Sequence, residues 1–131
     1  MMRNANIELE RVGQISVARN GVSPDAVAKA IQNLEGVRNA TMTITPEGVS
    51  GEHLMVAIDG SRAFLGLERT DGLLQFVVHG HNTEEAHVFS IGGQEAQIEG
   101  RYLPEVSIAA VVVEEWLQTG EASSQGHWER Q

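Results

Sequence analysis

Residues 54–78 read LMVAIDGSRAFLGLERTDGLLQFVV, and this stretch decides the fold. Two turn sequences, Asp59-Gly60 and Thr70-Asp71-Gly72, divide it into three apolar runs at 54–58, 63–67 and 73–78. Glycine after aspartate suits the positive φ angles that a tight hairpin turn requires, and apolar runs of this length are typical of strands. The stretch therefore predicts three antiparallel strands that follow one another as a meander.

Short β-rich runs continue on both sides of this meander. Residues 87–91 and 94–98 bracket Gly92-Gly93, which predicts a further hairpin. The second of these runs alternates polar and apolar residues, so the hairpin is expected to have a glutamate-bearing outer face. Upstream, residues 40–44 predict a strand, and residues 7–17 predict one or two more.

A first helix is expected at about residues 23–35. Ser23 is a typical N-cap residue, and Pro24 and Asp25 are favoured in a first helical turn, where the acid lies near the positive end of the helix dipole. Apolar residues recur after them at helical spacing, and Gly36 follows as a terminator. The segment therefore predicts a helix of about three turns.

A second helix is expected at about residues 107–119, with Ser107 as its N-cap and Gly120 as a left-handed C-cap. The β-branched residues within 108–113 favour a strand as the alternative. Beyond this helix, Trp128 is expected to be a tail residue whose large ring docks onto the domain.

These elements predict the fold class. We expect an α+β single domain over residues 1–131, ordered from about 7 to 128. Its sheet should be mostly antiparallel, with about five to seven strands packed by the helices at about 23–35 and 107–119. A chain of 14.2 kDa is large enough to bury a core without disulfide or metal support.

Charge and composition limit the classes of function. The net charge is −9, and residues 66–131 hold 11 of the 18 acidic residues but only three of the nine basic ones. An acidic half repels phosphate backbones, so we expect no nucleic-acid binding; it attracts basic proteins, although acidity also serves solubility. The absence of cysteine excludes disulfides, a thiol nucleophile and thiolate zinc sites.

No segment indicates export or membrane insertion. The first residues lead into Ile7-Glu8-Leu9-Glu10 without an apolar leader run. The longest apolar run, at 108–113, is far shorter than the roughly 20 residues that a membrane span needs. We therefore expect a cytoplasmic protein that does not cross a bilayer.

One set of residues has the chemistry of metal ligands: His79, His81, Glu85 and His87. Alternation along a strand would place His79 and His81 on one face, and a turn could return His87 toward them. Histidines beside a polar loop are more often solvated, so we expect no metal; a small metal-dependent enzyme is an alternative. No serine elbow, phosphate loop or matched carboxylate pair is recognisable, so we expect neither catalysis nor a cofactor.

The second half of the chain carries a family resemblance. It is carried by the series Phe64-Leu65-Gly66-Leu67-Glu68, Tyr102-Leu103-Pro104, Thr119-Gly120-Glu121 and Trp128, with a glycine-bearing hairpin and a helix between them. The most specific portion is the run from Leu103-Pro104 through the helix and Thr119-Gly120-Glu121 to Trp128. In this order, over about residues 54–128, the chain resembles the first-numbered immunity protein family of bacterial polymorphic toxin systems. It departs from that family at Ala122-Ser123-Ser124, where a basic residue and a proline are common.

The resemblance implies a non-enzymatic cytoplasmic protein that binds and neutralises a cognate toxin domain, often a nuclease or a nucleic-acid deaminase. It brings no catalytic residues. A toxin that acts on nucleic acid needs a basic active-site rim, so exposed carboxylates of this chain are expected to pair with it, and Tyr102 to be an anchor or else a half-buried connector. An acidic secretion chaperone is the alternative function. The candidate toxin-binding residues are Asp71, Glu84, Glu85, Glu95, Glu99 and Tyr102.

Overall fold

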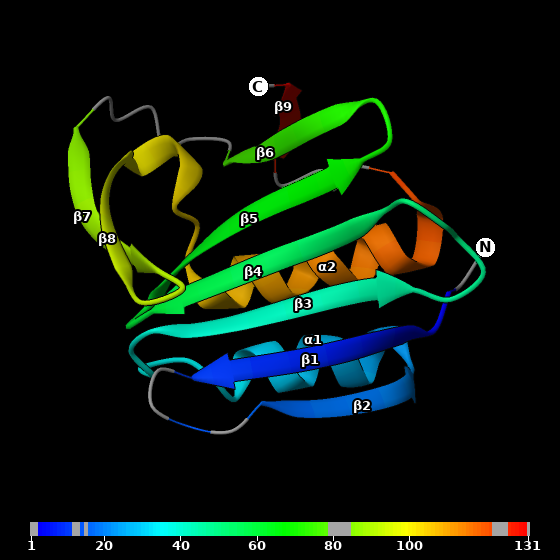
Figure 1. Ribbon diagram of the computed structural model, residues 1–131. Helices are drawn as coiled ribbons and strands as arrows, with labels where there is room; N and C mark the ends of the chain where they lie inside the picture. The colour runs from blue at the N-terminus through cyan, green and yellow to red at the C-terminus, as the bar shows by residue number, and fades with distance from the viewer. Residues whose placement is uncertain (1–2, 12–13, 15, 79–84, 122–125, 131) are drawn as a thin grey trace.

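A computed structural model describes residues 3–11, 14, 16–78, 85–121 and 126–130 (Figure 1). Seven strands form one antiparallel sheet in the order β2-β1-β3-β4-β5-β6-β9, and two further strands form a separate hairpin. The elements are β1 Ala5–Arg11, β2 Val17–Val22, α1 Pro24–Gln32, β3 Ala40–Pro46, β4 His53–Asp59, β5 Arg62–Arg69, β6 Gly72–Val78, β7 Ala86–Ile91, β8 Gln94–Glu99, the short 3-10 helix η1 Gly100–Tyr102, α2 Val106–Thr119 and β9 Gly126–Arg130. The predicted α+β class, with a sheet packed by two helices, is confirmed.

The predicted meander forms β4, β5 and β6. Its first turn is one residue later than the sequence suggests, because Asp59 pairs with Arg62 and leaves Gly60 and Ser61 as the turn residues. Among these, Gly60 has the positive φ, +76°. In the second hairpin both Gly92 and Gly93 have positive φ angles, as a two-residue turn of type I′ requires.

Both helices lie on the same face of the sheet and pack against each other, behind the strands as drawn in Figure 1. The sheet residues that face them alternate with residues of the opposite face, as strand geometry dictates. Large side chains of this core are fully buried and come from both layers; they include Ile31, Met42, Leu65, Phe76 and Trp116.

Helix α1 begins as expected but ends earlier. Ser23 has the extended backbone of an N-cap, yet its hydroxyl donates to Asp25 Oδ1 (2.8 Å) and makes no side-chain bond to the helix N–H groups. The helix ends at Gln32, and a turn leads to Gly36, whose φ is +88°. The predicted range 23–35 therefore contains three turn residues at its end.

Helix α2 corrects one prediction and confirms another. Its N-cap is Glu105, not Ser107, because hydrogen bonds from Ala63 N to Pro104 O and from Val106 N to Ser61 O hold the chain extended against β5 until that point. Gly120 is the left-handed C-cap, with φ +77°. The β-branched run at 108–113 is helical because burial against the sheet outweighs its weak helix propensity.

The C-terminal segment is a strand, which corrects the prediction of a tail, whereas the predicted docking of the Trp128 ring onto the domain is confirmed. Strand β9 pairs with β6, and Trp128 lies in it with its ring edge-on to Phe76, 5.3 Å between centroids. Gly126 begins the strand where a Cβ would collide with the Val77 carbonyl oxygen, so only glycine allows this close pairing. Upstream, the predicted strand region 7–17 proves too short, since β1 and β2 extend from Ala5 to Val22.

The described residues include no helix that is both long and apolar enough to span a membrane.

Candidate functional site

The second hairpin covers part of the sheet face that the helices leave open. Phe89 of β7 is buried there together with Ala57, Phe64 and Leu103, and this small cluster is separate from the main core. Every residue of 94–97 is exposed and Val88 keeps 63% of its surface accessible, whereas Ile91 and Ile98 are partly buried against this cluster. The hairpin is therefore held against the sheet through Phe89, close to its turn, and is exposed on its outer side.

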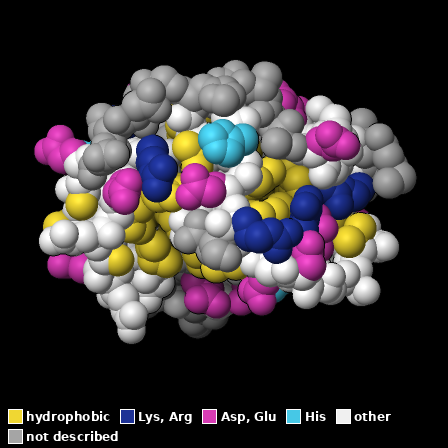
Figure 2. All heavy atoms as spheres, turned by 90° about the horizontal axis from the view of Figure 1, so that it is seen from above, with side chains coloured by type: hydrophobic (Ala, Val, Ile, Leu, Met, Phe, Trp, Pro, Cys, Tyr) yellow, Lys and Arg dark blue, Asp and Glu magenta, His cyan; other side chains and the backbone are white. Residues whose placement is uncertain are grey.

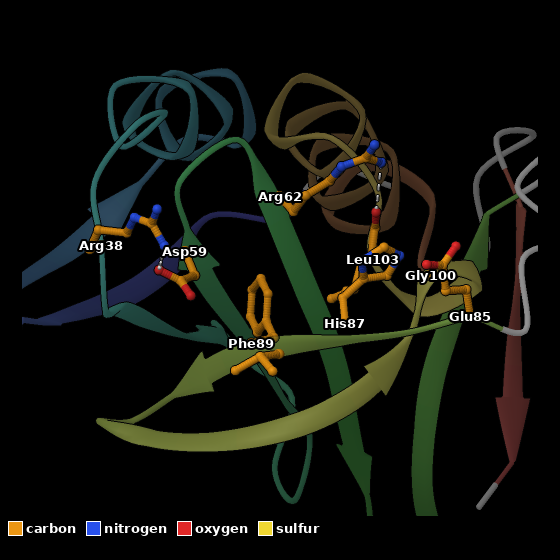
Figure 3. A pocket seen from close by; sticks show the side chains of 9 residues that line it. Arg38, Asp59, Arg62, Glu85, His87, Phe89, Gly100 and Leu103 are labelled. Atoms are coloured by element: carbon orange, nitrogen blue, oxygen red, sulfur yellow. Dashed lines mark hydrogen bonds and ion pairs between the residues drawn. The ribbon is translucent and has the colours of Figure 1, made fainter.

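A cavity of about 410 Å³, lined by both charged and apolar residues, lies between this hairpin and the sheet, and we call it the anchor cavity (Figure 3). Asp59, whose side chain is only 9% exposed, accepts from Arg38 Nη1 at 3.3 Å and from the Ser90 backbone N–H at 3.2 Å. Arg62 donates to the Leu103 carbonyl at 3.1 Å. The Asp59 contact ties β7, close to the hairpin turn, to the turn between β4 and β5, and the Arg62 contact ties the segment after η1 to β5.

The open face also holds a groove beside the hairpin, which we call the Gly66 groove. It consists of two hollows of about 200 and 400 Å³ that share Phe64 and Gln75. One in-register row of residues crosses its floor, because each pairs with the next across neighbouring strands. From β3 to β9 this row is Thr43, Met55, Gly66, Gln75 and Glu129.

Carboxylates stand on both sides of the Gly66 groove. On one side Glu68 Oε2 lies 3.0 Å from His53 Nε2. On the other, Glu99 pairs with Arg101 at 3.0 Å, and Glu129 accepts from the Tyr102 hydroxyl at 2.6 Å. That hydrogen bond, followed by burial, raises the pKa of the Tyr102 hydroxyl.

The predicted binding residues are separated by the fold. Glu99 and Tyr102 border the Gly66 groove, and Glu85 lines the anchor cavity. Glu95 is exposed in β8 and makes no ion pair within the described part of the chain. Glu84 lies outside the described residues.

Asp71 does not belong to this site. It lies in the turn between β5 and β6, at the opposite end of β5 from the contact between Asp59 and Ser90. Arg130 donates to its carboxylate (3.2 Å) and to its backbone carbonyl (2.8 Å). This hydrogen bond and the charge of Arg130 lower the pKa of Asp71. Asp71 therefore lies apart from the other described candidates, Glu85, Glu95, Glu99 and Tyr102, and its role in toxin binding stays a prediction.

The candidate metal ligands are only partly described. His87 and Glu85 both line the anchor cavity, whereas His79 and His81 lie outside the described residues. Among the residues that are described, no group of three or more potential ligands could hold a metal ion.

Sequence reasoning missed four residues of the groove: His53, Glu68, Gln75 and Glu129. Their side chains project from the open face because strand residues alternate between two faces. The sequence carried a signal for this in β4 and β5, namely the alternation of residues along each strand. The residues next to the fully buried Leu54, Val56 and Leu67 point to the opposite face and therefore toward the groove. Glu129 gave no such signal, since its strand was not expected.

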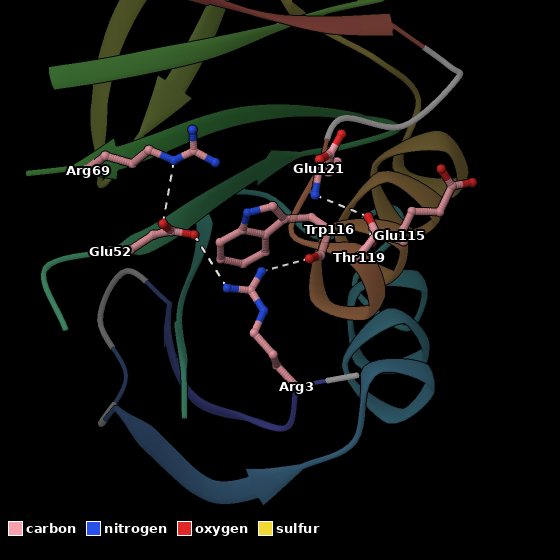
Figure 4. A network of polar contacts seen from close by, with 7 residues as sticks. All are labelled: Arg3, Glu52, Arg69, Glu115, Trp116, Thr119 and Glu121. Carbon is pink, nitrogen blue, oxygen red and sulfur yellow. Dashed lines mark hydrogen bonds and ion pairs between the residues drawn. The ribbon is translucent and has the colours of Figure 1, made fainter. Parts of the chain in front are cut away.

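A second polar network lies at the C-terminal end of α2, away from the Gly66 groove (Figure 4). Arg3 donates to the Trp116 carbonyl at 2.7 Å, and its guanidinium lies 4.9 Å from the Trp116 ring centroid. Glu52 pairs with Arg3 at 3.6 Å and with Arg69 at 3.4 Å. A cation at a helix C-terminus is favourable, so this network stabilises the fold.

Charges on the β9 side of the molecule are mixed. Figure 2 looks onto that side and shows hydrophobic side chains at its middle, with basic and acidic side chains around them. Arg101 and Arg130 supply part of the basic charge and are paired with Glu99 and Asp71.

Comparison with known proteins found no match: no protein-family model matches this chain, and neither does any curated protein.

Proposed function

We propose that this protein is an immunity protein that binds a cognate bacterial toxin domain and neutralises it by occupying its surface. The family resemblance of residues 54–128 supports this function, and so does the acidic excess of the second half. In this proposal the protein acts in the cytoplasm, and the toxin acts on nucleic acid and presents a basic active-site rim.

The observation that carries the proposal is the bare hairpin. A hairpin that is anchored by a buried carboxylate and a buried phenylalanine loses little conformational freedom when it binds, so its exposed outer side is prepared for a partner. Glu95 on that side has no internal counter-charge within the described residues and is available to a basic partner. A stoichiometric binder needs such a surface and no reacting group.

The test is co-expression with the product of the neighbouring reading frame. A toxin domain that arrests growth alone, that is tolerated in the presence of this chain, and that co-purifies with it at one-to-one stoichiometry supports the proposal. Growth arrest that persists in the presence of this chain, with no complex, overturns it. Light scattering of the free protein discriminates the alternative, because a secretion chaperone that holds an extended client segment should itself be a dimer.

A further inference from the structure

Gly66 is an unusual residue for its position, in the middle of β5 between two paired strands. Its φ is not in the left-handed region, and a Cβ there would make only ordinary contacts, 3.7 Å to Phe64 and 3.8 Å to Met55. The backbone therefore does not require glycine. Glycine weakens a strand and often marks a place where another molecule approaches closely. Its effect here is to leave a pit in the floor of the Gly66 groove.

The pit is apolar at its base and polar at one wall. The Met55 and Phe64 side chains border it. The neighbouring Gln75 side-chain amide makes no hydrogen bond within the described part of the chain. Leu73, which lines the same hollow, keeps 44% of its surface accessible. A purely apolar guest would bury the Gln75 amide unpaired, which is unfavourable.

The charges around the Gly66 groove indicate which kind of polar ligand it favours. Glu68 stands on one side of the groove, and Glu99 and Glu129 stand on the other. Arg101 is the one guanidinium among the described rim residues. His53, the partner of Glu68, adds positive charge only when it is protonated. Three carboxylates against one guanidinium leave the rim acidic above an apolar floor.

We propose that the Gly66 groove receives an arginine side chain from a protruding loop of the toxin. This inference rests on the proposed function and names the chemistry of the partner at that site. The alkyl stem lies in the pit against Met55 and Phe64, as long basic side chains commonly lie on apolar surface. The guanidinium donates to the Gln75 amide oxygen and to the rim carboxylates. Its planar set of five donors matches several acceptors better than the single ammonium of lysine does.

The first experiment uses a defined probe. Acetyl-Gly-Arg-Gly-amide is titrated into the isotope-labelled protein, and amide chemical shifts are followed by NMR. Saturable shifts should be largest at Met55, Gly66 and Gln75. The citrulline peptide, which has the same shape without charge, and the norleucine peptide should each give shifts at least threefold smaller at equal concentration. Shifts of equal size with citrulline, shifts located elsewhere, or no shifts at all would overturn the assignment.

Variants make the test specific. Gly66→Leu fills the pit and should abolish the arginine shifts, whereas Thr45→Leu adds the same side chain to an exposed β3 position on the same sheet face and should leave them unchanged. Should Gly66→Leu fail to fold, Glu68→Gln keeps the test decisive, because loss of this carboxylate should weaken peptide binding about threefold. Equal binding by wild type and Glu68→Gln, or a lysine peptide that binds more tightly than the arginine peptide, would contradict the proposal.

The toxin complex separates this inference from the proposed function. A toxin that binds wild type and Gly66→Leu equally well leaves the immunity function intact and overturns the groove as its arginine seat. Arginine-peptide shifts at Gly66, together with no toxin complex, leave the groove as an arginine-binding site and overturn the immunity function and, with it, the toxin as the source of the arginine.

Discussion

The two faces of the sheet use the same strands for opposite purposes. On the helix side, Leu54, Val56 and Leu65 are fully buried against α1 and α2. On the other side, the neighbouring Met55 and Gly66 line a groove that remains open beside the hairpin. Because alternate residues point to opposite faces, one face can be optimised for stability while the other is kept for a partner. Substitutions on the two faces should therefore differ in what they change.

The largest effect on stability should come from the helix side. Trp116→Ala removes a fully buried ring and its contact with Arg3, and it should lower the free energy of unfolding by about 3–5 kcal/mol. Urea denaturation followed by circular dichroism measures this change. A loss of less than about 1 kcal/mol would contradict the full burial of Trp116 in this core.

The second tryptophan provides a graded comparison. Trp128 is only partly buried and packs edge-on against Phe76, so Trp128→Ala should cost about 2 kcal/mol and lower the melting temperature less than Trp116→Ala does. The same denaturation experiment tests it. Lost toxin binding with an unchanged melting temperature would show that Trp128 is an interface residue.

Loss of the contact that holds the hairpin near its turn should have a local effect. Asp59→Ala removes the acceptor of the Ser90 N–H and the partner of Arg38, at a cost of about 1–2 kcal/mol. Amide exchange at Ser90 and Phe89 should accelerate, while exchange in α2 should change little. Asp71→Ala, at the opposite end of β5, is the control and should leave exchange in the hairpin unchanged.

Charge reversal on the hairpin should affect binding and leave folding intact. Glu95→Lys combined with Glu99→Lys should lower the association rate with the toxin about tenfold at low salt and flatten its salt dependence. Glu35→Lys combined with Glu47→Lys makes the same change in charge at exposed positions elsewhere. Association kinetics that do not differ between the two double variants would remove the hairpin from the interface.

The smallest expected effect concerns pH. The folded protein raises the pKa of Tyr102 above its ordinary value of 10.0, so it holds that proton more tightly than the unfolded chain does. The resulting stabilisation is fully present below pH 10 and is lost as the pH rises through the folded pKa. Urea denaturation at pH 8 and above pH 10 should show a smaller alkaline loss in Tyr102→Phe than in wild type. An equal loss would mean that the bond to Glu129 is not formed in solution.

The fold was largely predictable because its signals are local. The Asp-Gly and Gly-Gly turns and the apolar runs between them lie within a few residues of one another, and they predicted β4 to β8 correctly. Strand β9 was missed because Gly126–Arg130 has no apolar alternation, and its strand character depends on pairing with β6 about 50 residues earlier in the chain. The start of α2 was missed for the same kind of reason, since β5 decides it.

The site was less predictable because acidic residues are easily counted but their partners are distant. Asp71 is neutralised by Arg130, 59 residues away, and Tyr102 is held by Glu129, 27 residues away. No pattern in the sequence brings these pairs together. Gly66 was visible in the sequence, but only the register of β4, β5 and β6 shows that it opens a pit between neighbouring side chains.

Amide hydrogen exchange of this protein, free and in a one-to-one complex with the toxin from the neighbouring reading frame, tests the central claim most directly. We expect new protection in β7 and β8 and around Gly66 and Gln75, with α1 and α2 unchanged. Protection confined to the helices or to β2, with the hairpin and the Gly66 groove exchanging as in the free protein, would contradict the account.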